Sequence, residues 1–243
     1  MKALIFDCDG VLVDTERDGH RVGFNRAFEA FGIDAEWSVE LYARLLLVAG
    51  GKERMTAYFD EFGWPGDKVA EHGGRSELIL ALHRKKTEIT AGLVGEGALP
   101  LRPGIARIVD EAIAAGVRLG VCTTSNPKFI DAVLDLLGHT RKARFEFVHA
   151  GDVVSRKKPD PEIYLLAKKS LGLPNHRCVV IEDSRNGLLA AKGAGLPCLI
   201  TTSTYTVDED FSEADRVVSE LGEPPNVQVT LEDLSKLAAQ AAA

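Results

Sequence analysis

The stretch MKALIFDCDGVLVD, residues 1–14, decides how the chain folds. Its residues 2–7 form an apolar run without polar alternation, which is typical of a buried strand. Asp7 and Asp9 follow where the run ends, and residues two apart on extended backbone project to the same side. Two carboxylates so close repel each other unless a cation or a shared proton relieves them, and Mg²⁺ prefers such oxygen ligands. Gly10 would let the backbone turn there. A solvated acidic turn would fit the same residues, so the pattern alone leaves both interpretations open.

Outward from this strand, most of the chain alternates short apolar runs with helical patterns. The runs expected as strands are 118–122, 145–149, 178–181, 197–200 and, more weakly, 216–219. The helical patterns cover 105–115, 129–137, 161–171, 186–194 and 232–243. This alternation predicts an α/β fold with a Rossmann-like doubly wound parallel sheet and right-handed crossovers.

The stretch between the first two expected strands is different. From residue 15 to residue 91 the pattern is helical and nearly free of strand signals, and glycine-rich breaks divide it. We expect about four helices there, forming a cap domain over 15–99. The core domain would then consist of 1–14 and 100–243. Two short linkers would let the cap hinge over the carboxyl edge of the sheet, where open α/β sheets bind ligands.

Composition excludes several classes of protein. The chain has 243 residues, 45% hydrophobic and 27% charged, as ordinary globular proteins do. Its net charge of −7 argues against binding to nucleic acid, which needs a basic surface. No apolar run is long enough for a membrane span, and residues 1–14 lack the features of a signal or transit peptide, so we expect a cytoplasmic protein. We expect it to act as a monomer. The cysteines Cys8, Cys122, Cys178 and Cys198 form no metal-binding spacing and are expected to be reduced and buried.

Other predicted strand ends also carry polar residues. Glu182 and Asp183 follow the run 178–181, and a second run ends in the hydroxyl-rich 123–126, whose free N–H groups could cradle an anion at a helix start. Lys158 precedes Pro159 and a helix that begins with proline. Each cluster alone would also fit helix capping or a surface turn. Four such clusters at strand-to-helix junctions favour a functional site.

In this order, the motifs resemble those of the haloacid-dehalogenase superfamily of phosphotransferases. The matching residues are Asp7-Cys8-Asp9-Gly10-Val11-Leu12, Thr123, Lys158-Pro159 and Glu182-Asp183. The helical insert resembles that superfamily's small α-helical cap. Three segments, DCDGVLVDTERDGH at 7–20, GGKERMTAYF at 50–59 and AGDVV at 150–154, resemble the CbbY-type sugar-bisphosphate phosphatases. This resemblance implies hydrolysis of xylulose 1,5-bisphosphate, an inhibitor of ribulose-bisphosphate carboxylase.

The resemblance also implies the roles of residues in the core domain. Asp7 would be the nucleophile, and Asp9 the general acid and then the general base. Mg²⁺ would be held by the Asp7 carboxylate, the Asp9 carbonyl and Asp183, with Glu182 acting mainly through water. Lys158 and Thr123, with the N–H groups around Thr124, Ser125 and Asn126, would bind the transferring phosphoryl group.

The predicted cap supplies a second cationic set, which suits a substrate with two phosphates. The residues expected to bind substrate there are Glu16, His20, Gly50, Gly51, Lys52, Glu53, Arg54, His83 and Lys86. His83 and Lys86 would share one face of a helix, since they lie three residues apart. For Arg84 and Lys85, and to a lesser degree for Lys86, a solvated helical face is the competing interpretation. Trp37 and Trp64 are expected to serve packing.

Two other functions compete with the phosphatase. A mutase resembling β-phosphoglucomutase would share the fold, but those mutases carry a histidine five residues after the aspartate that corresponds to Asp14. Here that position is Gly19, and His20 follows one place later. Lys52 also stands where those mutases have an arginine. A non-catalytic sugar-phosphate sensor is disfavoured because Asp7 and Asp9 are both present.

Overall fold

The structure, a computed structural model, describes residues 1–48, 50–95 and 99–240. The chain divides into two compact units. The core consists of Met1–Thr15 together with Leu99–Ala243, and the cap consists of Glu16–Ala98. Both boundaries lie within one residue of the expected limits 1–14, 15–99 and 100–243.

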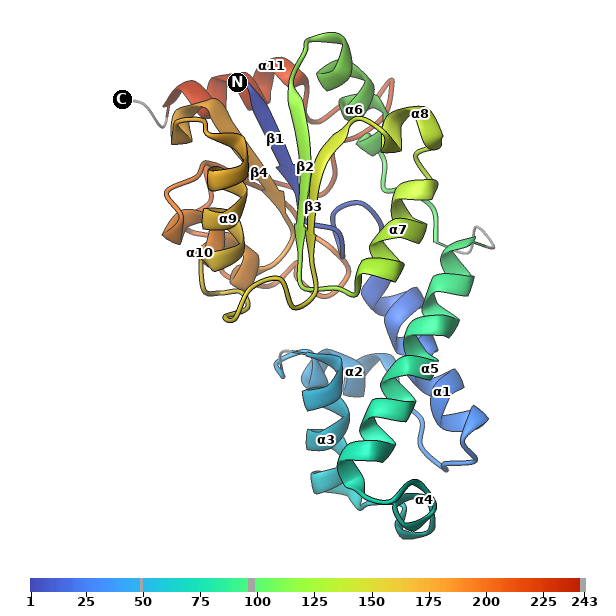
Figure 1. Ribbon diagram of the computed structural model, residues 1–243. Helices are drawn as coiled ribbons and strands as arrows, with labels where there is room; N and C mark the ends of the chain where they lie inside the picture. Colours follow the sequence, from blue (N-terminus) through green and yellow to red (C-terminus); the bar gives the residue numbers. More distant parts are fainter. Residues whose placement is uncertain (49, 96–98, 241–243) are drawn as a thin grey trace. The chain divides into compact units, whose positions relative to one another are not determined.

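The core is built on one parallel sheet, as predicted. Its six strands are β1 (Ala3–Phe6), β2 (Arg118–Thr123), β3 (Phe145–Ala150), β4 (Cys178–Glu182), β5 (Cys198–Thr201) and β6 (Arg216–Val218). They lie in the order β3-β2-β1-β4-β5-β6, and every neighbouring pair is parallel (Figure 1). From β1 the chain adds strands on one side through β2 and β3, and it then crosses over and adds β4, β5 and β6 on the other side. The sheet is therefore doubly wound, and its switch point lies between β1 and β4.

Helices cover both faces of the sheet. They are α6 (Ile105–Ala114), α7 (Pro127–Asp135), α8 (His139–Lys142), α9 (Glu162–Leu171), the 3₁₀ turn η2 (Asn175–Arg177), α10 (Arg185–Gly193) and α11 (Leu231–Gln240). Helices α9 and α10 bury their apolar residues against one face of the sheet, where Ala3 and Ile5 of β1 point. Helix α6 contacts β2, helix α11 contacts β4, and the two helices contact each other. The strands β1, β2, β4 and β5 are therefore buried on both sides, which explains why they lack polar alternation.

The predicted strands and long helices of the core are confirmed, with ends shifted by one or two residues. The short α8 and η2 were not predicted, because neither buries a residue and neither has an apolar pattern. The last part of the helix expected over 232–243 lies outside the described residues, whose final helix ends at Gln240. All four cysteines are buried and free, as expected.

The described part of the cap contains a π-helical turn, η1 (Glu16–His20), and five α-helices. The α-helices are α1 (Arg21–Ala30), α2 (Val39–Leu45), α3 (Gly51–Phe62), α4 (Gly66–His72) and α5 (Arg75–Gly95). The expectation of four helices is therefore wrong by one, α4. None of the seven residues of α4 is buried, so no apolar periodicity marks it in the sequence.

The cap has its own aromatic core. Trp37 is fully buried between Phe24 and Phe28, with ring centroids 4.5 and 5.2 Å away. The ring of Trp64 packs against that of Phe59 in a tilted arrangement, and the guanidinium of Arg75 lies 4.7 Å from the Trp64 ring centre. Both tryptophans therefore pack, as expected.

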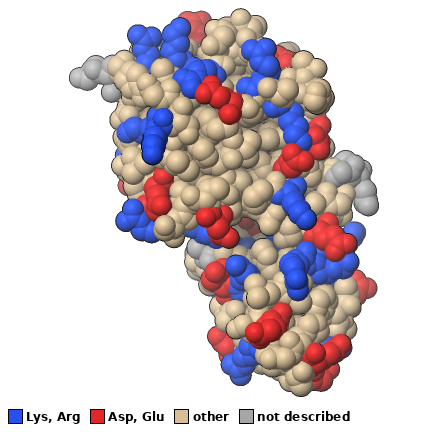
Figure 2. Space-filling model, in the orientation of Figure 1, with Lys and Arg blue, Asp and Glu red and all other residues tan. Residues whose placement is uncertain are grey.

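No helix in the described ranges combines the length and the apolar character that crossing a bilayer requires. On the face shown in Figure 2, basic and acidic side chains are intermixed over both units.

Candidate active site

The carboxyl ends of β1, β2 and β4 bring the predicted polar residues of the core together. Asp7 comes directly after β1, Thr123 is the last residue of β2, and Glu182 is the last residue of β4. Phe6 pairs with Val121 on one side and with Ile181 on the other, so these ends lie at the same level. The site therefore lies at the switch point of the sheet.

Lys158 joins two of the acidic residues. Its Nζ donates hydrogen bonds to Asp7 Oδ1 (2.6 Å), Glu182 Oε1 (2.5 Å) and the carbonyl of Cys122 (3.0 Å). The side chain of Lys158 is only 8% exposed. Burial alone would lower the pKa of Lys158, but Asp7 and Glu182 outweigh that effect and raise it. Burial raises the pKa of Asp7 well above its ordinary value, although Lys158 opposes this shift.

Three carboxylates face one another around this lysine. Asp7, Glu182 and Asp183 are buried, and each offers an oxygen within 4.8 Å of the others. Lys158 supplies one positive charge against these three carboxylates, so a further cation would relieve their repulsion. Oxygen donors of this kind fit Mg²⁺, which binds carboxylates and carbonyls. The residues present therefore suit a magnesium ion.

Glu182 is held mainly by protein donors. Its Oε1 also accepts a hydrogen bond from the hydroxyl of Tyr164 (2.5 Å), and its Oε2 accepts one from the N–H of Asp183 (3.2 Å). Both oxygens are thus engaged by the chain itself. The expected role of Glu182 beside the cation stays a prediction.

Close packing next to Asp183 explains why glycine occupies position 10. A Cβ atom on Gly10 would lie 1.9 Å from Asp183 Oδ2, and Gly10 has a φ of +76°. Either condition alone disfavours a side chain. Asp183 Oδ2 also accepts a hydrogen bond from the hydroxyl of Ser203 (2.6 Å), which follows β5. The loops after β1 and β5 therefore both contact this carboxylate.

Asp9 stands in a different environment from Asp7. Its Oδ1 accepts a hydrogen bond from the Thr15 hydroxyl (2.5 Å), and its Oδ2 accepts one from the Ser125 hydroxyl. Two neutral donors from separate segments thus orient this carboxylate. Such a setting suits a group that gives and takes a proton.

The segment after β2 is partly explained by local structure. Asn126 caps α7 by accepting from the N–H of Lys128 (2.9 Å), which is the simpler of its two predicted roles. Thr123 is buried, and its hydroxyl accepts from the N–H of Ser125 (3.1 Å). Thr124 is exposed. Thr123 and Ser125 are therefore the members of this segment that connect directly to the site.

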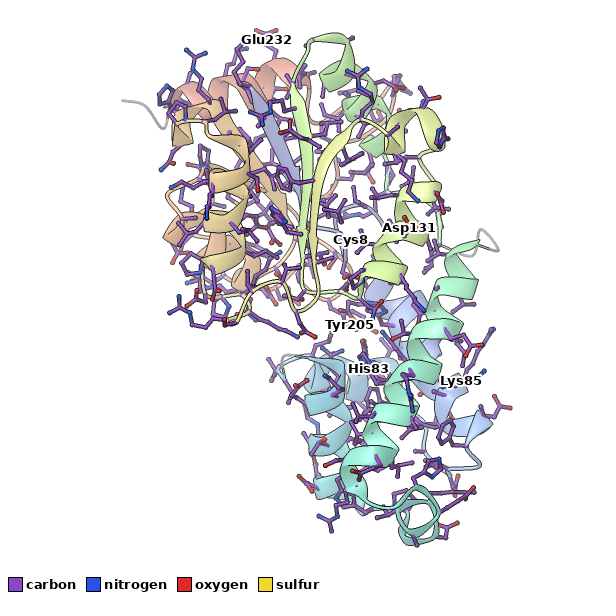
Figure 3. The ribbon with its side chains drawn as sticks, viewed as in Figure 1. Cys8, His83, Lys85, Asp131, Tyr205 and Glu232 are labelled. Carbon is purple, nitrogen blue, oxygen red and sulfur yellow. The ribbon has the colours of Figure 1, made fainter. Side chains whose placement is uncertain are left out.

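Cys8 and Cys122 lie beside the site, and Figure 3 shows Cys8 just past the end of β1. Both are fully buried. Burial raises the pKa of each thiol, and the nearby carboxylates raise it further. The thiols therefore stay protonated and unreactive near neutral pH, as expected for core cysteines.

The cap holds a first polar group at its N-terminal turn. The hydroxyl of Tyr42 donates to Glu16 Oε2 (2.5 Å) and accepts from a guanidinium N–H of Arg54 (2.8 Å). Arg54 is itself buried, and its Nε donates to the carbonyl of Leu45 (3.1 Å). Tyr42 therefore links the predicted anionic and cationic residues Glu16 and Arg54 into one group.

A second polar group lies between α1 and α5. Lys86 Nζ lies 2.8 Å from His20 Nδ1 and 4.9 Å from the ring centre of Phe24. Since an ammonium group can only donate, Nδ1 of His20 is the acceptor. Lys86 is 8% exposed, so the solvated-face interpretation is wrong for it. Lys85 pairs instead with Glu88 on the exposed side of α5, as that interpretation requires (Figure 3).

The start of α3 packs against His83. A Cβ atom on Gly51 would lie 3.2 Å from His83 Cδ2, and one on Gly50 would lie 2.1 Å from Glu53 Oε2. Glu53 thus folds back over Gly50. Burial lowers the pKa of His83 to about 4, with Lys86 and Lys52 adding to the effect, so the ring is neutral near pH 7.

Several residues that hold the predicted site residues were not singled out from the sequence. They are Thr15, Tyr164 and Ser203 in the core, and Tyr42 in the cap. Only Thr15 carried a signal, because it adjoins the acidic motif. The others lie on helices and loops with no distinctive pattern.

Comparisons with known proteins identify the family of this chain. A family model described as haloacid dehalogenase-like hydrolase matches residues 1–195. A CBBY-like protein from Arabidopsis thaliana is 50% identical over 94% of this chain and 72% of its own length. The protein CbbY from Cereibacter sphaeroides is 42% identical over 92% of this chain and 94% of its own length. A crystal structure of a CbbY variant from Rhodobacter sphaeroides in complex with xylulose 1,5-bisphosphate has a TM-score of 0.83 and 39% identity, covering 96% of this chain and 99% of that one.

Proposed function

The chain belongs to the haloacid dehalogenase-like hydrolases, and on this premise we propose that it is a Mg²⁺-dependent phosphatase that converts xylulose 1,5-bisphosphate to xylulose 5-phosphate. The phosphatase class follows from the family and from the relatives named CbbY. The substrate is inferred from the related structure that contains xylulose 1,5-bisphosphate. The observation that carries the proposal is that Asp7 and Asp9, two residues apart, are each held by side chains from other segments of the core. Asp7 contacts a buried lysine, and Asp9 accepts hydrogen bonds from the hydroxyls of Thr15 and Ser125.

These two settings suit two different chemical roles. In the first step an oxygen of Asp7 attacks phosphorus, the bond from phosphorus to the sugar oxygen breaks, and an aspartyl-phosphate forms. Asp9 gives its proton to the departing sugar oxygen. In the second step Asp9 takes a proton from the water that attacks phosphorus, and inorganic phosphate and free Asp7 result. A general acid and base placed in this way typically contributes about 10²–10⁴-fold in rate.

Other core residues prepare the reacting groups. The Asp7 and Asp183 carboxylates, with the main-chain carbonyl of Asp9, would hold Mg²⁺, which when bound offsets the repulsion between the nucleophile and the phosphate. We assign Lys158 and Thr123 to the oxygens of the transferring phosphoryl group, where electrostatic stabilisation matters most. Glu182 orients Lys158 through their 2.5 Å contact.

The cap residues are assigned to the rest of the substrate. Arg54 and Lys86 are buried cations, and Lys52 lies on the first turn of α3 next to Gly50 and Gly51. We assign the second phosphate to this set, with support from His20 and His83. Glu16, oriented by Tyr42, is assigned to the sugar hydroxyls, and Glu53 is assigned to the Gly50 loop.

A panel of sugar phosphates tests this function. Xylulose 1,5-bisphosphate, ribulose 1,5-bisphosphate, xylulose 5-phosphate and β-glucose 1-phosphate would be incubated with the protein and Mg²⁺. Inorganic phosphate and sugar-phosphate products would be measured in the same samples. The proposal expects fastest phosphate release from xylulose 1,5-bisphosphate and none without Mg²⁺. Conversion of β-glucose 1-phosphate to glucose 6-phosphate without net phosphate release would instead identify a mutase.

A further inference from the structure

Arg102 joins three segments of the core that are distant in sequence. One guanidinium nitrogen donates to the carbonyl of Gly10 and to that of Thr201 (3.1 Å). The other donates to the carbonyls of Thr202 (2.8 Å) and Ser219 (2.6 Å). The main-chain N–H of Arg102 donates to the carbonyl of Leu12 (2.8 Å). The residue therefore connects the loop after β1 with the ends of β5 and β6.

Two of these segments contact the same carboxylate. Gly10 lies directly against Asp183 Oδ2, because a Cβ atom on Gly10 would come within 1.9 Å of that oxygen. Ser203, which follows Thr202, donates to that same oxygen at 2.6 Å. Arg102 thus holds together the two loops between which Asp183 Oδ2 lies. It touches neither Asp7 nor Asp9 through any described hydrogen bond.

The geometry of the guanidinium group matters here. Its planar fork directs one nitrogen toward Gly10 and Thr201 and the other toward Thr202 and Ser219, which a single ammonium nitrogen cannot do. Burial lowers the pKa of Arg102, while the charges of Asp14 and Asp183 favour its cationic form. The group nevertheless stays charged, because arginine does not lose its proton at physiological pH.

We propose that Arg102 is a positioning residue for the metal site. By tying Gly10 to the segment 201–202, it fixes the loop that carries the Asp9 carbonyl relative to Asp183. The inference rests on the proposed Mg²⁺-dependent function, because it concerns the ligands assigned there. Mutation of a residue that orients metal ligands typically weakens metal binding by about 10–100-fold.

Arg107 provides a matched control within the core. It lies on α6, and its guanidinium also donates to main-chain carbonyls, those of Leu221 (3.1 Å), Gly222 (3.0 Å) and Val229 (2.8 Å). None of these acceptors belongs to the loops after β1 or β5. Arg107→Met therefore removes a similar set of hydrogen bonds without touching the site.

The test measures Mn²⁺ binding by electron paramagnetic resonance in the full chain, without substrate. The proteins are the wild type, Arg102→Met, Arg102→Lys and Arg107→Met, each checked for folding by circular dichroism. We expect both Arg102 variants to bind Mn²⁺ about 10–100-fold more weakly, and Arg107→Met to bind like the wild type. The lysine variant keeps charge and most of the volume, so it provides a folded protein for the comparison.

Three results would overturn the inference. Equal Mn²⁺ affinity in Arg102→Met and the wild type would show that Arg102 does not position the metal ligands. Equal weakening in Arg102→Met and Arg107→Met would show a general effect on the fold. Normal binding by Arg102→Lys would show that charge alone is enough. If instead the wild type bound no Mn²⁺, the metal dependence in the proposed function would itself be refuted.

Discussion

Lys158 offers the sharpest test of the electrostatics at the core site. Replacement of Lys158 by methionine keeps the length of the side chain but removes its charge. Asp7 and Glu182 would then lose the cation that contacts both at 2.6 and 2.5 Å. All three side chains are less than one tenth exposed, so water cannot take over the role of the lysine.

The magnitude follows from two independent considerations. Removing one partner of a buried ion pair typically costs about 3–5 kcal/mol in the free energy of unfolding. The variant can escape that cost by protonating Asp7, which for an ordinary aspartate requires about 5 kcal/mol at about pH 7.5 and about 2 kcal/mol at about pH 5.5. The expected loss is therefore about 3–5 kcal/mol at the higher pH and at most about 2 kcal/mol at the lower pH.

The direction of this pH dependence has a definite cause. Burial already raises the pKa of Asp7, and Lys158 opposes that rise. Without the lysine the pKa of Asp7 rises further, so the folded variant binds a proton that the unfolded chain releases. Its stability, relative to that of the wild type, therefore improves as the pH falls.

Urea unfolding followed by far-UV circular dichroism at both pH values, without metal, measures the effect. Lys192→Met serves as the control, since Lys192 pairs with Asp215 at 2.9 Å in the same unit but is one third exposed. That pair should contribute about 0–1 kcal/mol at either pH. A loss below about 1 kcal/mol for Lys158→Met at the higher pH, or a loss that does not change with pH, would refute the buried-cluster reasoning.

Three further predictions concern single residues. Asp9→Asn should bind Mn²⁺ normally, because only the carbonyl of Asp9 is assigned to the metal, but should lose about 10²–10⁴-fold in turnover. Paramagnetic resonance measures the Mn²⁺ binding and phosphate release measures the turnover. Weakened Mn²⁺ binding with a normal saturated rate would contradict the assignment. Lys86→Ala should lower kcat/KM by about 10–100-fold more for xylulose 1,5-bisphosphate than for a monophosphate; equal losses would mean that Lys86 does not bind the second phosphate. The His83 ring should titrate near its lowered pKa of about 4, as measured by nitrogen-15 NMR. Because the unfolded chain then binds a proton that the folded cap does not, the stability of the cap should decrease as the pH falls from 6.5 toward 4. A titration midpoint near 6.5 would contradict the burial of His83.

Much of the core fold could be predicted because its central strands are buried on both faces. β1 and β4 have no exposed residue, so the apolar runs stand out and their ends agree with the structure within one residue. The polar residues Asp7 and Glu182 then marked the ends of those strands. By contrast, α4 buries nothing, so its only marks in the sequence are the glycines around it.

The contacts around the site could not be predicted in the same way. Tyr164 meets Glu182 across 18 positions, and Ser203 meets Asp183 across 20, so both contacts depend on how helices and loops pack after the sheet has formed. Neither residue belongs to a pattern that separates it from ordinary helix or loop positions. Sequence motifs therefore located the acidic centre but not the residues that hold it.

The placement of Lys86 shows the same limit in the cap. The sequence allowed either a phosphate-binding role or a solvated helical face for it. The outcome depends on Gly23, where a Cβ atom would lie 2.2 Å from the Thr90 hydroxyl and would push α1 away from α5. This close approach brings His20 within 2.8 Å of Lys86. A glycine within a helix does not by itself predict a close contact between two helices, because the sequence does not say which helix packs against it.

The central claim, that Asp7 takes the phosphoryl group, has a direct chemical test. The protein would be mixed with xylulose 1,5-bisphosphate and Mg²⁺, quenched within a turnover and treated with borohydride, which reduces an aspartyl-phosphate to homoserine. Peptides covering residues 1–15 would then be sequenced by mass spectrometry. We predict homoserine at position 7 when substrate is present, and unmodified Asp7 when it is omitted. An unmodified Asp7 together with a phosphorylated residue elsewhere would contradict the account.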